Sequence, residues 1–537
     1  ENLNYNLLNL LRYKKSFNVQ NFEAFVAHES YATETKFMYA SMYKLVMPDG
    51  VEFNNAVISN PPGSYLNNYS LESYFGQLNY DYDGKYFLSA TVRRDGSSRF
   101  LKNKWGDFGS LGAAWLVSKE AFMENVPLIK DLKLKASYGL IGEQGGIGLY
   151  PGYDLFQVQN LNQNISLSFV SKGNPDLTWE ISKQMQVGTE FKLGKYLDVA
   201  IDYYTKTTDN LIFDRRVGPS VGYASLRVND GALRNTGLEF DITAHLLQTK
   251  NNFLDFTING EMIENRMLRL PIDPATGKEK IIDIDGIYGR AVGHSIFDFY
   301  TREFAGVNPE TGVSEWNVYW ADANGDNIRQ ASENIKSMAD FEATATAETL
   351  KKVQVSRTSA YAEGTTKFIN KSPFPTVRGA FSLNGGFGNF DINMQFLYSL
   401  GGYAYDGAYA GLMNSGGAAG GNNFHTDILS RWSQRGQATD VPRLSAGQDA
   451  NVSSGSTRFI TKSDFLALNN LQIGYKVPSK FFTNSPITGV YLWVSGDNLF
   501  LASARNGFNP SSAETGGSDT YRYSPLSTMT AGLRVKF

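Results

Sequence analysis

The stretch Leu132-Lys-Leu-Lys-Ala-Ser-Tyr-Gly-Leu140 alternates apolar residues with polar or small ones along its whole length. Phe390-Asp-Ile-Asn-Met-Gln-Phe-Leu-Tyr-Ser399 repeats the pattern, with Leu397 as the exception. Successive side chains of a β-strand point to opposite faces, so a period of two predicts a strand with one apolar and one polar face. Both stretches therefore indicate β-structure.

The length of the alternating runs separates two kinds of β-protein. Soluble antiparallel sheets, with one face on a core and the other in water, give the same alternation. Their strands, however, cluster near about 5–6 residues. The runs in this chain extend over roughly 10–12 residues, and a tilted strand needs about 9–11 residues to cross a bilayer. Run length therefore favours strands that cross a membrane.

Connections between the expected strands alternate between long and short. We expect sixteen strands, at residues 2–13, 19–29, 35–44, 70–81, 84–93, 106–118, 131–141, 181–192, 195–206, 235–246, 253–264, 376–384, 389–400, 463–477, 489–500 and 526–537. The long connections are 45–69, 142–180, 207–234, 265–375, 401–462 and 501–525; the short ones are 82–83, 119–130, 193–194, 247–252, 385–388 and 478–488. Only 14–18 and 94–105 are short where this order predicts a long connection. Short periplasmic turns and long extracellular loops are typical of outer-membrane barrels, so we expect an all-β, transmembrane antiparallel β-barrel.

Composition excludes several functional classes. The 537 residues include no Cys and only four His, and the formal net charge is −3. Without a basic field no nucleic-acid partner is expected, and without Cys neither disulfides nor a thiolate metal site can form. No nucleophile elbow, P-loop or His-Glu-x-x-His motif occurs. We therefore expect a protein that is not an enzyme and that requires no cofactor.

From about residue 70 to its end the chain carries an ordered series of motifs. They include Leu71-Glu-Ser-Tyr-Phe-Gly-Gln-Leu-Asn-Tyr80, Arg93-Arg-Asp-Gly-Ser-Ser-Arg-Phe100, Gly173-Asn-Pro-Asp-Leu-Thr-Trp-Glu180, Thr439-Asp-Val-Pro-Arg-Leu444 and Ser495-Gly-Asp-Asn-Leu-Phe500. Together they resemble the SusC/RagA family of TonB-dependent outer-membrane transporters. The resemblance implies a 22-stranded barrel with an N-terminal plug inside it. Because no plug-like sequence is found, residues 1–537 are expected to be a C-terminal portion of such a barrel with long extracellular loops.

The resemblance also implies function and partners. It implies active import of oligopeptides or oligosaccharides, with a slight preference for peptides. A SusD/RagB-like surface lipoprotein would act as a lid, and TonB–ExbB–ExbD would supply energy through the N-terminal region. Dimers of transporter–lid pairs, embedded in membrane lipid and lipopolysaccharide, are expected. Two alternatives stay open, namely a passive porin and a surface-binding barrel that transports nothing.

One acidic segment has the spacing of a calcium loop. Asp322, Asn324, Asp326 and Glu333 stand at positions 1, 3, 5 and 12 of a twelve-residue stretch, which is the ligand spacing of that loop. Position 6 is Asn327 where Gly is usual, and Asn also adopts the left-handed conformation that the turn requires. Ca²⁺ is therefore a candidate ligand, and an ordinary turn in a long loop is the alternative.

Two groups of aromatic residues in the long loops are candidates for contact with substrate or lid. They are Trp316, Tyr319 and Trp320 in the longest loop, and Tyr403, Tyr405 and Tyr409 in another. Aromatic faces stack on sugar rings and pack against peptide side chains. The alternative is a girdle at the membrane interface. The lumen is expected to be wet and lined by residues that include Lys133, Lys135, Glu239, Asp241 and Gln395.

Overall fold

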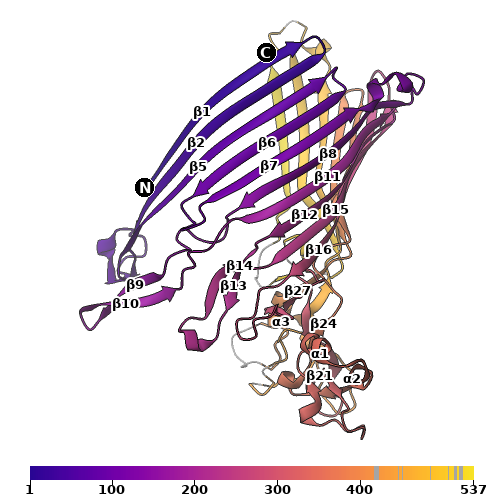
Figure 1. The fold of residues 1–537 in the computed structure, drawn as a ribbon. Helices are drawn as coiled ribbons and strands as arrows, with labels where there is room; N and C mark the ends of the chain where they lie inside the picture. The colour runs from indigo at the N-terminus through magenta and orange to yellow at the C-terminus, as the bar shows by residue number, and fades with distance from the viewer. Residues whose placement is uncertain are drawn as a thin grey trace.

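A single curved antiparallel sheet dominates the molecule (Figure 1). The computed structural model describes residues 1–416, 423–445, 447–449, 451–483, 485–505, 507–512, 517–518 and 524–537. The sheet has 15 strands: β1 (Asn2–Phe17), β2 (Gln20–Tyr39), β5 (Gly63–Tyr82), β6 (Tyr86–Ser97), β7 (Trp105–Leu116), β8 (Ile129–Glu143), β11 (Glu180–Leu193), β12 (Leu197–Asp209), β15 (Ala232–Gln248), β16 (Asn252–Arg269), β25 (Val377–Phe387), β26 (Phe390–Leu400), β29 (Phe465–Val477), β30 (Gly489–Ser503) and β32 (Thr528–Lys536). Each strand pairs with the next one in this order, so the sheet is a simple meander.

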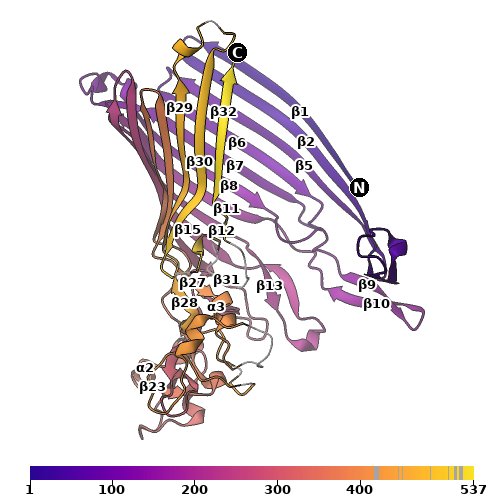
Figure 2. The same cartoon turned by 180° about the vertical axis from the view of Figure 1, so that it is seen from behind.

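The connections of the meander are segregated by length. The long connections 40–62, 144–179, 210–231, 270–376, 401–464 and 504–527 lie, as far as they are described, at one end of the sheet, the lower end in Figure 1. The connection 98–104 is the one short connection at this end among the described residues. Short turns lie at the other end, and Figure 2 shows the same arrangement from behind. The predicted alternation of long and short connections is therefore confirmed.

One part of the strand prediction is wrong. Residues 19–29 and 35–44 do not form two strands, because β2 runs unbroken over Gln20–Tyr39. It pairs with β5 along its whole length, from Gln20 opposite Tyr82 to Tyr39 opposite Gly63. Residues 30–34 contain no Gly, Pro or Asn to make a turn. The correction gives 15 strands, and the connection between β1 and β2 becomes a short turn at the short-turn end.

The two faces of the sheet differ in chemistry. Leu134 on β8 lies opposite Trp115 on β7 and Thr189 on β11, whereas the next residue, Lys135, lies opposite Ala114 on the other face. Along the first face large apolar side chains are exposed, for example Leu111 at 60%. In a bilayer such a face must contact lipid. We call it the lipid face, and the opposite face the polar face.

Aromatic pairs mark the borders of the lipid face. Tyr86 and Trp115 stack near the short-turn end, with ring centroids 6.2 Å apart, and Tyr74 and Trp105 lie 6.2 Å apart toward the loop end. Ten residues separate Trp105 from Trp115 on β7. This is about 33 Å along the strand and, at a tilt of about 40°, about 25 Å along the barrel axis, the usual height of the apolar band.

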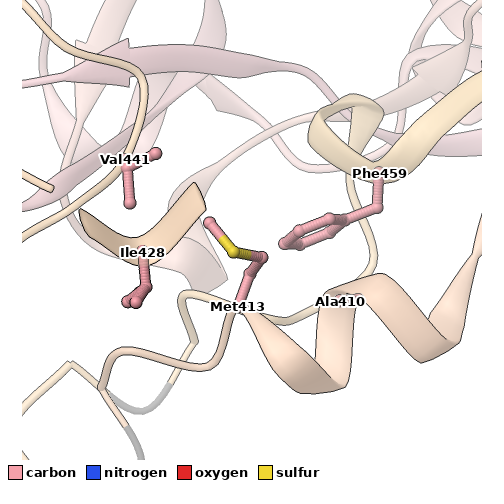
Figure 3. Packing of buried hydrophobic residues seen from close by; sticks show 5 residues of the cluster. All are labelled: Ala410, Met413, Ile428, Val441 and Phe459. Carbon is pink, nitrogen blue, oxygen red and sulfur yellow. The ribbon is translucent and has the colours of Figure 1, made fainter. Parts of the chain in front are cut away.

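The two longest connections fold into a compact unit, which we call the loop module (residues 270–376 and 401–464, as far as described). Its main elements are β20 (Phe304–Val307), β21 (Ser314–Ala321), β22 (Asn334–Ile335), β23 (Val353–Thr358), β27 (Tyr403–Asp406), β28 (Ile460–Lys462), α1 (Met338–Thr344), α2 (Ala347–Lys351) and α3 (Gly407–Leu412). Figure 3 shows one of its clusters, in which Met413 lies between Phe459 and Ile428. Within the described residues no helix has the length and apolar character needed to cross a membrane.

Shorter strands complete the remaining connections. They are β3 (Met42–Leu45), β4 (Ala56–Ser59), β9 (Leu155–Leu161), β10 (Asn164–Ser171), β13 (Ile212–Arg216), β14 (Ser225–Asn229) and β31 (Gly517–Ser518). The loop module adds four more short strands, β17 (Asp283–Asp285), β18 (Tyr288–Arg290), β19 (Tyr300–Arg302) and β24 (Thr366–Phe368). Most of them pair as local hairpins. β31 pairs in parallel with β27, so a segment of the last long connection lies against the loop module.

Candidate functional site

The polar face carries a network of ion pairs across neighbouring strands. The Lys135 Nζ atom lies 2.8 Å from Glu190 Oε1 and 3.0 Å from Asp202 Oδ2, and Lys133 Nζ lies 3.5 Å from Glu190 Oε2. The strand register brings these residues together, because Lys133 lies directly opposite Glu190 and Lys135 directly opposite Gly188, whose other neighbour is Asp202. This part of the face is charged but largely self-neutralised.

A cavity of about 740 Å³ lies beside this network on the polar face. Its sheet wall comes from β12, β15, β16, β25 and β26, and residues around 373–375, 463–465 and 510–511 border it from the loop end. The polar lining consists mainly of Asp202, Glu239, Asp241, Asn259, Glu261 and Arg378. Glu239 lies opposite Glu261, and Asp241 opposite Asn259. Directly opposed residues share a face, so strand pairing alone gathers these carboxylates.

The carboxylates of the cavity differ in their partners. Arg378 forms an ion pair with Glu261 from the adjacent strand. Glu239 and Asp241 have no ion pair within 4.0 Å and no hydrogen bond to any residue that the structure describes. Their charges therefore act on whatever enters the cavity. Carboxylates accept hydrogen bonds only, so the cavity suits ligands with ammonium, guanidinium, amide or hydroxyl groups.

The residues that were predicted to line the lumen lie on the polar face of the sheet. Lys133, Lys135, Glu239 and Asp241 are all on the polar face, and Gln395 follows on β26, where it accepts a hydrogen bond from the Asn469 amide at 3.2 Å. Period-two alternation was sufficient to find them, because the polar face holds every second residue.

Three contributors to the cavity were missed. Asn259 and Glu261 belong to an alternating run, Asp255 to Met262, that could have revealed them. Arg378 stands 117 positions after its partner Glu261. No local pattern predicts that pairing, nor the approach of residues 510–511 to the same cavity.

The first aromatic group lies mostly inside the loop module. Trp316 and Trp320 are 4% and 3% exposed, and the Trp320 indole N–H donates to Ser356 Oγ at 2.9 Å. Tyr319 is half-buried and donates its hydroxyl proton to Glu303 Oε2 at 2.8 Å. Burial raises the pKa of Tyr319 above its usual range. These side chains hold β21 within its small sheet, and their contact with substrate or lid stays a prediction.

The second aromatic group also packs within the loop module. The Tyr405 ring lies edge-on to Phe459, with centroids 6.2 Å apart, and burial raises the pKa of Tyr405 to about 12. The Tyr409 hydroxyl donates to Asp427 Oδ2 at 2.7 Å, and burial together with this bond raises the pKa of Tyr409 to about 12. Tyr403 lies under the Lys371 ammonium, 4.8 Å from its ring centroid. A role for the three rings in contact with substrate or lid is likewise untested.

The candidate calcium loop forms a hydrogen-bonded turn. Asp322 is 5% exposed, and its two carboxylate oxygens accept the backbone N–H groups of Gly325 at 2.8 Å and Asn327 at 3.2 Å. Asn327 adopts the expected left-handed conformation, with φ of 57°. The three remaining candidate ligands also accept backbone N–H groups, and they are Asn324, Asp326 and Glu333. Among the described residues no group of three or more His, Cys, Asp or Glu side chains is arranged to hold a metal ion, and calcium binding stays a prediction.

Taken together, a long-stranded meander with an exposed apolar face, a charged opposite face and long loops at one end defines an outer-membrane β-barrel protein. The family model "TonB dependent receptor-like, beta-barrel" matches residues 2–271, half of the chain. The chain belongs to this family of outer-membrane receptors, as its motifs predicted.

Individual relatives support the same assignment. TonB-dependent receptor P3 of Formosa agariphila is 30% identical over 98% of this chain and 52% of its own length. TonB-dependent receptor SusC of Bacteroides thetaiotaomicron is 25% identical over 88% of this chain and 44% of its own length. A solved structure described as the RagAB peptide transporter superposes with a TM-score of 0.80 at 25% identity, covering 100% of this chain and 56% of that one. The chain thus spans about half the length of the relatives it matches.

Proposed function

We propose that this chain forms part of the barrel wall of an active importer of oligopeptides in the outer membrane. The observation that carries the proposal is the cavity on the polar face, in which the carboxylates of Glu239 and Asp241 have no partner among the described residues. A free peptide has an N-terminal ammonium group, and many peptides add Lys or Arg side chains. Charge-assisted hydrogen bonds from such groups to carboxylates are about twice as strong as neutral ones. The fold shared with the RagAB peptide transporter supports this choice.

In the proposed mechanism the loop module and a SusD/RagB-like lipoprotein capture the peptide outside the membrane. The peptide then passes to the cavity, where Glu239 and Asp241 bind its cationic groups. Lys133 and Lys135 are already paired with Glu190 and Asp202. They therefore compete only weakly with the peptide for the carboxylates of Glu239 and Asp241. TonB–ExbB–ExbD would drive release into the periplasm through the N-terminal region of the longer protein.

An oligosaccharide is the second candidate substrate. SusC is 25% identical to this chain, and carboxylates together with the Asn259 amide also bind sugar hydroxyls. Mass spectrometry of the material that co-purifies with the transporter separates the two. A ladder of peptides supports the proposal, whereas a single glycan series overturns its substrate.

The decisive experiment removes the two unpaired charges without changing side-chain shape. In cells carrying the full-length protein, Glu239→Gln with Asp241→Asn should raise the half-saturating concentration of a Lys-containing peptide about tenfold, because each neutral amide keeps a hydrogen bond of about half the strength. Uptake of an acidic peptide of equal length should not fall. Glu124→Gln, at an exposed position of the short-turn end outside the loop module, is the matched control.

The same assay tests the alternative functions. Active import requires that uptake stop when the proton-motive force is collapsed. Uptake that persists would identify a passive porin, and peptide that binds the cell surface without entering would identify a surface-binding barrel. Equal loss of both peptides in the double variant would contradict the assigned role of Glu239 and Asp241.

A further inference from the structure

Four neighbouring strands place three cations and a hydroxyl in one row on the lipid face. Lys183 on β11 lies opposite Thr207 on β12, Thr207 lies opposite Arg234 on β15, and Arg234 lies opposite Arg266 on β16. Because directly opposed residues of antiparallel strands share a face, the four side chains project from the sheet side by side. We call them the cation row.

The cation row lies just beyond the apolar band, on the side of the long loops. Four residues nearer to the short turns, on the same two strands and the same face, Leu238 and Met262 are 37% and 45% exposed. Leu238 is ten residues from Gln248, the end of β15. This places it about 25 Å above the short turns for a strand tilted by about 40°, the height of the apolar band. Arg234 and Arg266 therefore lie at the level of lipid headgroups.

The protein leaves the charge of the row partly unneutralised. Lys183 Nζ lies 2.8 Å from Asp209 Oδ2, and Arg266 Nε donates to Glu264 Oε1 at 2.8 Å. Arg234 Nε donates to Thr207 Oγ1 at 3.3 Å, and no carboxylate of the described residues lies within 4.0 Å of its guanidinium. Like charges directly opposite each other destabilise a strand pair. The pair Arg234 and Arg266 therefore favours an external anion.

We propose that the cation row binds the phosphate of a phosphorylated glycolipid of the outer leaflet. The forked guanidinium groups of Arg234 and Arg266 match phosphate oxygens in two-point contacts, and Thr207 supplies a hydroxyl between them and Lys183. The acyl chains of the same lipid lie along Leu238 and Met262. These exposed apolar side chains lie four residues below the cations, beyond the opposed pair Thr236 and Glu264, and they distinguish a lipid from free phosphate as the ligand.

The first test uses the full-length wild-type protein purified from outer membranes in mild detergent. Native mass spectrometry follows its titration with lipid A that carries two phosphates and with the same lipid after removal of both. The phosphorylated lipid should bind at low micromolar concentration and the dephosphorylated lipid should not. Equal binding of the two would overturn the proposal. Displacement of the bound lipid by millimolar inorganic phosphate would show that the row recognises phosphate alone and would overturn the assignment of a lipid as its ligand.

The second test uses Arg234→Gln combined with Arg266→Gln. Removing two cations next to an anionic headgroup should weaken binding of phosphorylated lipid A about thirtyfold. Replacing both by Lys should restore much of the affinity, because the charge returns without the fork. The control is Arg435→Gln, an exposed position of the loop module. Unchanged lipid binding in the double Gln variant would show that the cation row has no role in lipid recognition. If this variant assembles poorly, the titration of the wild-type protein still tests the proposal.

Discussion

The transmembrane sheet and the loop module use the same apolar residue types in opposite ways. On the lipid face Val92 and Leu111 are 69% and 60% exposed, whereas in the loop module Phe299 and Val318 are 0% exposed. The short strand β21 alternates just as the long strands do, but its regularly spaced apolar side chains point into protein. Alternation therefore shows that a segment is a strand. Whether its apolar face contacts lipid or packs against protein depends on the surroundings of the strand.

The two regions also differ in what holds them together. In lipid every backbone N–H and C=O must find a partner within the protein, and the continuous pairing from β1 to β32 supplies those partners within the sheet, apart from the outer edges of these two end strands. The loop module depends on side chains that join its two long connections. The Trp432 indole N–H donates to the Pro309 carbonyl at 2.8 Å, and Arg458 lies over the rings of Phe304 and Phe459. Burial of Arg458 lowers the pKa of its guanidinium to about 10.

The largest expected effect comes from emptying the core of the loop module. Trp316→Ala should destabilise the module by about 3–5 kcal/mol, the usual cost of truncating a buried large aromatic side chain. Limited proteolysis should then cut within residues 270–376 while the sheet keeps its heat-modifiable migration on gels. Leu111→Ala on the lipid face, which should cost only about 0.5 kcal/mol, is the control. Loss of the folded sheet in the Trp316 variant would show that the two regions are not independent.

A charge on the lipid face should have the next largest effect. Leu111→Lys is expected to cost about 2–4 kcal/mol near the middle of the bilayer, measured as a lower folded fraction in an unfolding titration in lipid vesicles. Ser110→Lys changes the next residue, which points to the polar face, and should be tolerated. If both variants assembled equally well, the assignment of the two faces would be wrong.

Much of the sheet was predictable from sequence because lipid and lumen impose opposite demands on alternate residues. Leu134 and Lys135 are assigned to faces by sequence alone. The continuity of β2 across residues 30–34 was not predicted, although these residues contain no Gly, Pro or Asn; the unbroken pairing with β5 shows the single strand. In the candidate site Glu239 and Asp241 were found by alternation, but Arg378 was not, because its position depends on strand pairing across more than a hundred residues.

The fold of the loop module was not predictable for the same reason. Trp316 and Tyr405, one from each aromatic group, were predicted as candidates for contact with substrate or lid, and their burial depends on partners far along the chain. Trp316 packs against Tyr361, with ring centroids 5.2 Å apart. Tyr405 depends on Phe459, more than fifty residues away. The sequence identifies aromatic residues that can pack against other groups. Only long-range packing shows whether they contact a ligand or one another.

The smallest expected effect is the loss of loop-module stability at alkaline pH, since it is absent at neutral pH. It also separates the loop module from the transmembrane sheet. Tyr405 and Tyr409 have pKa values raised by burial from about 10 to about 12. The folded module therefore favours their neutral forms, and this contribution is fully present below pH 10 and is lost as the pH rises from 10 toward 12. Proteolytic cleavage within residues 401–464 should accelerate over this interval, while the backbone pairing of the sheet should persist. Tyr405→Phe removes one ionisable group and should move the onset to higher pH, whereas Tyr196→Phe, 61% exposed at a short turn, should not. An onset that is the same in all three proteins would mean that burial of Tyr405 does not control the alkaline opening of the module.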